Sequence, residues 1–322
     1  MQAWRVHTNG EPRDVMRLEE IPRPEPAPGQ LLVRVRAANV NYPDALLCRG
    51  EYQVRPPLPF TPGVELCGEV LAGPRTGERV LGQPALPCGA FGEFAVVTED
   101  SALPAPGALD DAEAAALHIG YQTGWFGLHR RARLQPGETL LVHAAAGGVG
   151  SAAVQLGKAA GARVIGVVGG QAKARAAREL GCDLVVDRRT EDVVAAVKEA
   201  TGGKGADVVY DPVGGDAYAA SAKCVAFEGR IVVVGFASGA VPTPGLNHAL
   251  VKNYSILGLH WGLYARKDPG AVAGCHRELT RLADEGLIRP LVSERVPLER
   301  AADAVQRVFD GTTTGRVVVR PG

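Results

Sequence analysis

The sequence lacks several features that mark whole classes of protein. Its 35 basic and 35 acidic residues balance, and it has no basic stripe, so the electrostatic footprint of a nucleic-acid-binding protein is missing. The N-terminus has no apolar core of the kind found in secretory signal peptides. The most membrane-like stretch, residues 140–157, contains four glycines, a His, a Ser and a Gln, so we expect no membrane-spanning helix.

Cysteine is present but follows no pattern. The six cysteines, at positions 48, 67, 88, 182, 224 and 275, form no close pair, and no C-x-x-C occurs. We therefore expect free thiols and a cytoplasmic protein rather than a disulfide framework. The length of 322 residues suggests about two domains, and no repeat or low-complexity linker divides them.

What is present most clearly is a glycine-rich turn after a strand-like apolar run. The segment from residue 140 to residue 155 begins as an apolar run that suits a buried strand, turns through small residues and continues as an Ala-rich helical pattern. Bare backbone N–H groups at such a helix N-terminus favour a pyrophosphate, although the same pattern also occurs in turns that bind nothing. The residues expected to contact a dinucleotide here are Ala146, Gly147, Gly148, Val149 and Gly150, whereas Ala145 replaces the first fingerprint glycine.

Strands and helices alternate around this turn. Residues 161–168 complete a βαβ unit, and further strands are predicted at 183–187, 206–210 and 230–235, with a helix at 191–200. This alternation indicates an α/β fold of the Rossmann type, a doubly wound parallel sheet. With this context, the dinucleotide interpretation is preferred.

The two ends of the chain differ from the middle. Residues 1–117 are rich in Pro and Gly, and short β-like runs at 30–36, 67–71 and 93–97 indicate a small barrel or sandwich. We assign residues 118–256 to the dinucleotide-binding domain. Residues 257–322 should hold helices near 271–286 and 298–311 and then a strand at 315–320, which most simply returns to the N-terminal sheet.

Seven segments in order carry a family resemblance: residues 39–44, 49–52, 62–65, 135–138, 144–150, 210–214 and 253–258. Together they resemble the medium-chain dehydrogenase/reductase superfamily, and most closely its zinc-independent quinone oxidoreductases, the zeta-crystallin branch. The resemblance covers essentially the whole chain. It implies a GroES-like β-barrel domain interrupted by a Rossmann domain, and a homodimer formed through the Rossmann domain, with residues 255–259 as a candidate edge strand.

The resemblance also predicts that this chain binds no metal. Zinc-dependent relatives use a Cys, a His and a further ligand at positions that match Asn41, Val64 and Ile119 here. Asn is a poor zinc ligand, and Val and Ile cannot ligate at all. Without a Lewis acid, hydride delivery to an electron-poor acceptor is expected rather than alcohol oxidation.

The second strand of the βαβ unit predicts NADPH as the cofactor. An NAD-binding site usually places an acid on the ribose about twenty residues past the loop, and residues 166–171 contain none. Lys173 and Arg175 follow at once, and Arg188 closes the next strand. Lys173 matches a family lysine, and at Arg188 relatives often have Tyr. A 2′-phosphate could lie among these cations. The alternative for Lys173 is a solvated helix position, but the missing acid favours the phosphate role.

Other candidate residues follow from the family pattern. Asn41 could hold a substrate carbonyl oxygen, and Tyr52, which matches a proton donor of related enoyl thioester reductases, could be catalytic or merely packed. Cofactor contacts are expected from Tyr42, Thr123, Phe236, Trp261 and Gly262. For the aromatic residues, core or interface packing is the alternative.

Three functions remain open from the sequence. The first is an NADPH-dependent quinone reductase without zinc. The second is a reductase of enoyl-CoA or alkenal substrates, which would use Tyr52 or water to protonate the α-carbon. The third is an NADPH-binding protein with little turnover. We expect a small-molecule quinone or enone substrate, with neither nucleic acid nor membrane as a partner.

Overall fold

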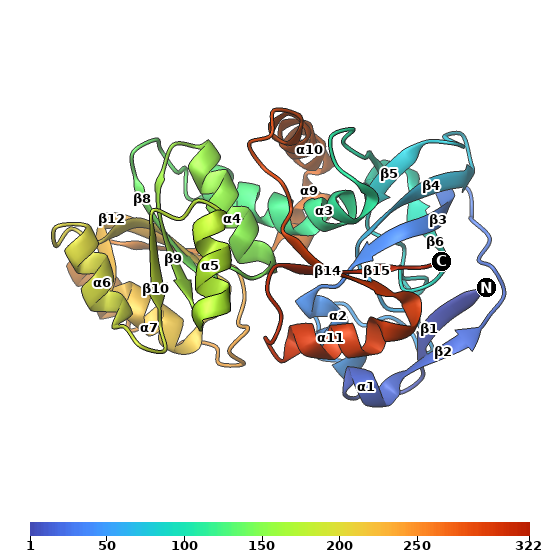
Figure 1. Cartoon of the computed structure of the whole chain (residues 1–322), viewed down its shortest axis with the longest axis horizontal. Coiled ribbons are helices and arrows are strands. Elements are labelled where there is room, and N and C mark those ends of the chain that lie inside the picture. The colour runs from blue at the N-terminus through green and yellow to red at the C-terminus, as the bar shows by residue number, and fades with distance from the viewer. The chain divides into compact units, whose positions relative to one another are not determined.

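The computed structural model describes all residues 1–322 and divides into two units (Figure 1). Unit 1 comprises residues 1–119 and 289–322, and unit 2 comprises residues 120–288. Unit 2 is therefore inserted into the chain of unit 1. The first boundary lies two residues from the expected one, but the second follows Ile288 rather than preceding Leu257.

Contacts within unit 2 explain the later boundary. Strand β13 (Ser255–Gly258) pairs in parallel with β12 (Val225–Val233) and extends its sheet. Trp261, which begins α9 (Trp261–Lys267), donates a hydrogen bond to Gln122, and Asp268 pairs with Arg130 beside α10 (Pro269–Asp284). The segment after residue 257 is thus anchored to unit 2.

Unit 2 is a doubly wound parallel sheet of six strands in the order β10-β9-β8-β11-β12-β13. The remaining strands are β8 (Thr139–His143), β9 (Arg163–Val168), β10 (Leu184–Asp187) and β11 (Ala206–Asp211). Their buried Val, Leu and Ile side chains form a continuous core, as expected for strands covered on both faces. The Rossmann prediction is confirmed.

Helices cover this sheet (Figure 1). Helices α4 (Gly148–Ala159) and α5 (Gln171–Glu179) contact β8, β9 and β10, and right-handed crossovers place them on one face. Helices α6 (Val193–Ala200) and α7 (Gly215–Cys224) contact each other and cover the opposite face. Helix α8 (Leu246–Lys252) precedes β13, and α3 (Asp111–Trp125) continues as a π-helical segment, Phe126–Arg131.

Unit 1 is built around a mostly antiparallel seven-stranded sheet, in the order β14-β15-β3-β4-β5-β7, with β6 also paired to β3. The strands are β3 (Gln30–Asn39), β4 (Leu66–Ala72), β5 (Arg79–Gly82), β6 (Phe94–Thr98), β7 (Leu103–Pro104), β14 (Val292–Pro297) and β15 (Arg316–Arg320). Because β15 pairs with β3, the predicted return of the last strand is confirmed.

The rest of unit 1 flanks this sheet. Strands β1 (Gln2–Val6) and β2 (Met16–Glu20) form a hairpin, and the helices are α1 (Pro12–Val15), α2 (Tyr42–Arg49) and α11 (Ala301–Phe309). Short 3₁₀ turns occupy Glu99–Ser101 and Leu298–Arg300. No helix in the protein is both long and apolar enough to cross a bilayer.

Candidate cofactor and active site

The glycine-rich turn between β8 and α4 has the geometry of an anion site. Gly147 is the extended N-cap of α4, and a Cβ on Gly150 would lie 2.1 Å from the carbonyl oxygen of Ala144. Glycine at position 150 therefore lets the helix approach the strand end. The N–H groups of Gly148, Val149 and Gly150 have no acceptor within the protein. Three bare donors at the positive end of a helix fit a pyrophosphate.

Three cations converge over the turn after β9. A Cβ on Gly169 would lie 3.5 Å from both Arg188 Nε and Arg189 Nε, and one on Gly170 would lie 3.0 Å from Arg189 Nη1. Burial, and then the charges of Arg189 and Arg188, lower the pKa of Lys173. Like charges held this close to one another favour binding of an anion such as a phosphate.

Asp187 fixes the position of these cations. Its Oδ1 accepts hydrogen bonds from Gly170 N (2.9 Å) and Arg189 N (3.1 Å), so it joins the turns after β9 and β10. These two bonds and the nearby arginine charges lower the pKa of Asp187. The carboxylate is therefore committed to shaping the two turns.

Further predicted residues follow the carboxyl ends of β12 and β13, and the glycine-rich turn follows the carboxyl end of the parallel strand β8. Phe236 is 38% exposed, and its ring lies against Gly214, where a Cβ would come within 2.8 Å. Trp261 is buried, with Nε1 donating to Gln122 Oε1 at 3.1 Å, and Gly262 follows it in α9. Thr123 is buried on α3.

In unit 1, Asn41 belongs to a buried hydrogen-bond network. Its Nδ2 donates to Glu65 Oε2 (2.8 Å) and to the carbonyl of Asn39 (3.3 Å), and its Oδ1 accepts from Arg316 Nη1 (3.1 Å). Glu65 also accepts from Asn39 Nδ2 and from Ile119 N. Both ends of the Asn41 side chain are therefore engaged.

The charges in this network are all buried. Burial raises the pKa of Glu65, while the Arg316 charge and the hydrogen bonds from Asn41, Asn39 and Ile119 oppose that increase. Asp44 caps α2: its carboxylate accepts from the backbone N–H groups of Asn41, Gly63 and Val64. Burial raises the pKa of Asp44 to about 7.

The two predicted tyrosines flank the same helix, α2. The Tyr42 ring stacks on Phe309 of α11, with centroids 5.3 Å apart, and burial raises its pKa. Tyr52 is half-buried against the hydrophobic core of unit 1, and its hydroxyl makes no hydrogen bond within the protein. Burial, and then the Asp44 charge, raise the Tyr52 pKa, so its hydroxyl is protonated at neutral pH.

The positions that match zinc ligands in relatives have other roles here. Asn41 is held by Glu65 and Arg316, Ile119 contributes a backbone N–H, and Val64 donates its backbone N–H to Asp44. No three His, Cys, Asp or Glu side chains gather in a way that would hold a metal ion. All six cysteines are free thiols.

Sequence reasoning missed two members of these sites. Arg189 was adjacent to a predicted cation but was not singled out, and the Arg-Arg pair was the available signal. Arg316 could not be assigned, because its contact with Asn41 spans 275 positions of the chain. The predicted residues therefore form two groups, one in each unit.

Comparison with known proteins agrees with this architecture. Residues 27–107 match the family model for the alcohol dehydrogenase GroES-like domain, and residues 148–273 match that for zinc-binding dehydrogenases. A quinone oxidoreductase-like protein 2 homolog from Nematostella vectensis is 38% identical over 301 residues, which cover 90% of this chain and 81% of that protein. The chain belongs to the medium-chain dehydrogenase/reductase superfamily, in its quinone oxidoreductase branch.

Two further relatives differ in how much of their length this chain covers. The crystal structure of Escherichia coli quinone oxidoreductase complexed with NADPH matches with a TM-score of 0.92 and 32% identity over the full length of both chains. The phthioceranic/hydroxyphthioceranic acid synthase of Mycobacterium tuberculosis is also 32% identical over 321 residues, which cover 98% of this chain but only 15% of the synthase. Similar sequences thus occur both as separate proteins and within a much longer one.

Proposed function

We propose that this protein is an NADPH-dependent oxidoreductase that reduces quinones without zinc. The observation that carries the proposal is the cluster of Lys173, Arg188 and Arg189 over a turn that lacks the usual acid, in the same unit as an open helix N-terminus. The similarity to a quinone oxidoreductase crystallised with NADPH supports it.

In this proposal, the residues of unit 2 bind and orient the cofactor. The N–H groups of Gly148, Val149 and Gly150 hold the pyrophosphate, with Ala146 and Gly147 shaping the turn, and Lys173 and the two arginines pair with the 2′-phosphate. Bound NADPH supplies the hydride. Thr123, Phe236, Trp261 and Gly262 are proposed contacts of its nicotinamide half, and Tyr42 is proposed as a contact from unit 1.

The donor set at positions 41, 64 and 119 supports chemistry without zinc. Asn, Val and Ile do not form a zinc site, and quinones need little electrophilic assistance to accept a hydride. Asn41 is the proposed donor to the substrate oxygen. To donate a hydrogen bond to the substrate oxygen, Asn41 Nδ2 would break its longer bond, the 3.3 Å contact to Asn39 O. It would keep the 2.8 Å bond to Glu65.

A second candidate function is reduction of an enoyl thioester or alkenal. The observation that favours it is Tyr52, whose hydroxyl is protonated, half-buried and without a partner, as a proton donor to an enolate carbon would be. In a quinone reductase the same hydroxyl has little to do, because a hydroquinone anion can take its proton from water.

We also propose a cytoplasmic homodimer formed through unit 2. Strand β13 is the edge of its sheet, and α8, which precedes it in the chain, exposes Leu246 and Leu250. An unpaired edge next to exposed apolar side chains suits pairing with a second copy. Sedimentation should give a dimer that Ile256→Asp dissociates, and a monomeric parent protein would contradict this part of the proposal.

A panel of acceptors tests the proposed reaction. NADPH oxidation should be followed with benzoquinone, a naphthoquinone, an alkenal and crotonyl-CoA, with NADH in a parallel series. Quinones should give the highest kcat/KM, with NADPH preferred over NADH. Higher kcat/KM on crotonyl-CoA would favour the second candidate, and NADPH binding without oxidation by any acceptor would contradict both.

A further inference from the structure

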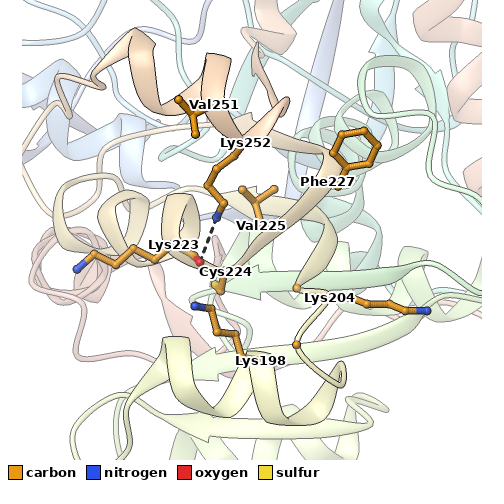
Figure 2. A pocket seen from close by; sticks show the side chains of 10 residues that line it. Lys198, Lys204, Lys223, Cys224, Val225, Phe227, Val251 and Lys252 are labelled. Carbon is orange, nitrogen blue, oxygen red and sulfur yellow. Dashed lines mark hydrogen bonds between the residues drawn. The ribbon is translucent and has the colours of Figure 1, made fainter.

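Lysine is rare in this protein, and most of its lysines gather at one place. The chain has only seven lysines among its 35 basic residues, the other 28 being arginine. Four of the seven, Lys198, Lys204, Lys223 and Lys252, line a pocket of about 350 Å³ in unit 2 (Figure 2). No arginine, aspartate or glutamate lines it.

The pocket lies away from the proposed cofactor site. Its lining includes Gly205, which directly precedes β11, Cys224, which ends α7, and Val225, which begins β12. These are the amino ends of parallel strands, whereas the glycine-rich turn follows the carboxyl end of β8. The pocket and the proposed cofactor site therefore lie at opposite ends of the strands of one sheet.

Capping of helix ends accounts for part of this positive charge. Lys252 Nζ donates to the carbonyls of Ala222 (2.8 Å) and Lys223 (3.1 Å) at the end of α7, and Lys198 and Lys223 stand in the last turns of α6 and α7. A helix C-terminus carries roughly half a negative charge. The C-termini of three helices, α6, α7 and α8, therefore neutralise less than half of the positive charge of the four ammonium groups.

The remaining charge has no partner in the protein. Lys198, Lys204 and Lys223 make no salt bridge, and the neighbouring acids Glu199 and Glu228 do not line the pocket. In Figure 2 the amino group of Lys252 lies above Cys224 and that of Lys198 lies below it, while Lys204 and Lys223 extend to opposite sides. Burial, and in part the charge of Lys198, lower the pKa of Lys252. Such an arrangement favours a bound anion.

One side of the pocket is apolar and open. Phe227 and Val251 are each 72% exposed at its edge, and Val225 lies between Phe227 and Lys252 in Figure 2. An exposed aromatic ring beside a set of cations suits a ligand with a flat ring and a phosphate group. The volume is within the range of pockets that hold one small metabolite.

We propose that this pocket binds a nucleoside diphosphate or a similar phosphate ester with a planar ring. Lys198 and Lys252 hold the phosphates, Lys204 and Lys223 close over them from the rim on their flexible stems, and Phe227 packs on the ring. Lysine suits this role because its ammonium is a compact charge that can reorient around a phosphate. The site is independent of the proposed oxidoreductase activity.

Chemical labelling of lysines tests the site directly. The protein saturated with NADP⁺ is treated with acetic anhydride, with and without ADP, and all seven lysines are quantified by mass spectrometry. ADP should slow acetylation of Lys198, Lys204 and Lys223 several-fold and leave Lys267, exposed on α9, unchanged. Protection of none of these lysines at millimolar ADP, or of Lys173 alone, would overturn the proposal.

Calorimetry with variants provides the second test, again with NADP⁺ present. Lys198→Gln combined with Lys223→Gln should weaken ADP and inorganic pyrophosphate by about tenfold or more, whereas Lys267→Gln should change neither. Phe227→Ser should weaken ADP but not pyrophosphate. Equal ADP affinity in the Lys198/Lys223 variant and the parent refutes the site. An unchanged ADP affinity in Phe227→Ser refutes the proposed packing of Phe227 on the ring of the ligand. NADPH oxidation enters neither test, so a failure here is distinct from a failure of the proposed reaction.

Discussion

The cation cluster after β9 and β10 should decide the choice between NADPH and NADH. The perturbation is the triple variant Lys173→Gln, Arg188→Gln and Arg189→Gln, which removes the charges and keeps long polar side chains. Arg175→Gln is the matched control, because Arg175 lies exposed on the same helix as Lys173, two residues further along. All four positions belong to unit 2.

The magnitude follows from the exposure of these side chains. A charge-assisted hydrogen bond contributes about 1.5–3 kcal/mol. Because Arg188 and Arg189 are both exposed, solvent weakens their bonds to the phosphate toward the lower value. Each contact is then worth roughly tenfold in affinity. Because three like charges share one phosphate, the losses are not additive, and we expect about a hundredfold weaker NADPH binding in the triple variant.

The assay is titration of nicotinamide fluorescence with NADPH and NADH. NADH affinity should change less than about threefold, since NADH has no 2′-phosphate. The parent preference for NADPH should also shrink as salt is raised to about 0.5 M. Equal NADPH and NADH affinities in the parent, or equal losses in the triple variant and Arg175→Gln, would refute the assignment.

The remaining predictions concern the turn, the metal, the tyrosine and the buried acid. Gly150→Ala places a Cβ 2.1 Å from the Ala144 carbonyl, so NADPH binding and the melting temperature should both fall, whereas Gly107→Ala, with no atom within 4 Å, should leave both unchanged. Purified protein should contain less than about 0.1 zinc per chain and keep its activity with chelators, and one zinc whose removal abolishes activity would contradict this. Tyr52→Phe should lower quinone turnover less than about tenfold, and a loss of ~10²–10⁴-fold on crotonyl-CoA would instead indicate a general acid. The folded-state pKa of Asp44, about 7, lies above its unfolded value, so the stability it contributes is complete below about pH 4 and is lost as the pH rises through 7. The melting temperature should therefore fall more between pH 5 and 8 in the parent than in Asp44→Asn, and identical slopes would exclude this assignment.

Much of unit 2 was predictable because its signals are local. Each inner strand is a short apolar run bounded by turn residues, and the glycine-rich turn is specified within about ten consecutive residues. Strand β12 begins five residues earlier than predicted, at Val225 instead of Arg230. The segment between them includes Glu228 with φ of 56° and a register shift, an irregularity that hides the strand period.

The role of Arg189 was hidden by the same dependence on local pattern. Strand periodicity sends adjacent side chains to opposite faces, so Arg188 and Arg189 would not be expected to act together. The strand ends at Asp187, however, and its carboxylate holds Arg189 N and Gly170 N in one turn. Both guanidinium groups can therefore lie over Gly169.

The buried network in unit 1 depends on pairing across almost the whole chain. The sequence shows that positions 41, 64 and 119 carry no zinc ligands. It does not show the hydrogen-bond network that these positions form instead. Because β15 pairs with β3 through Val318 and Asn39, Arg316 at the start of β15 reaches Asn41 just after β3. Its guanidinium brings a permanent positive charge to Glu65 and opposes the rise in the Glu65 pKa that burial causes. The returning strand thus places Arg316 against Asn41, the proposed donor to the substrate. In the proposed reaction the C-terminal segment would therefore orient that donor, a role that its sequence pattern does not indicate.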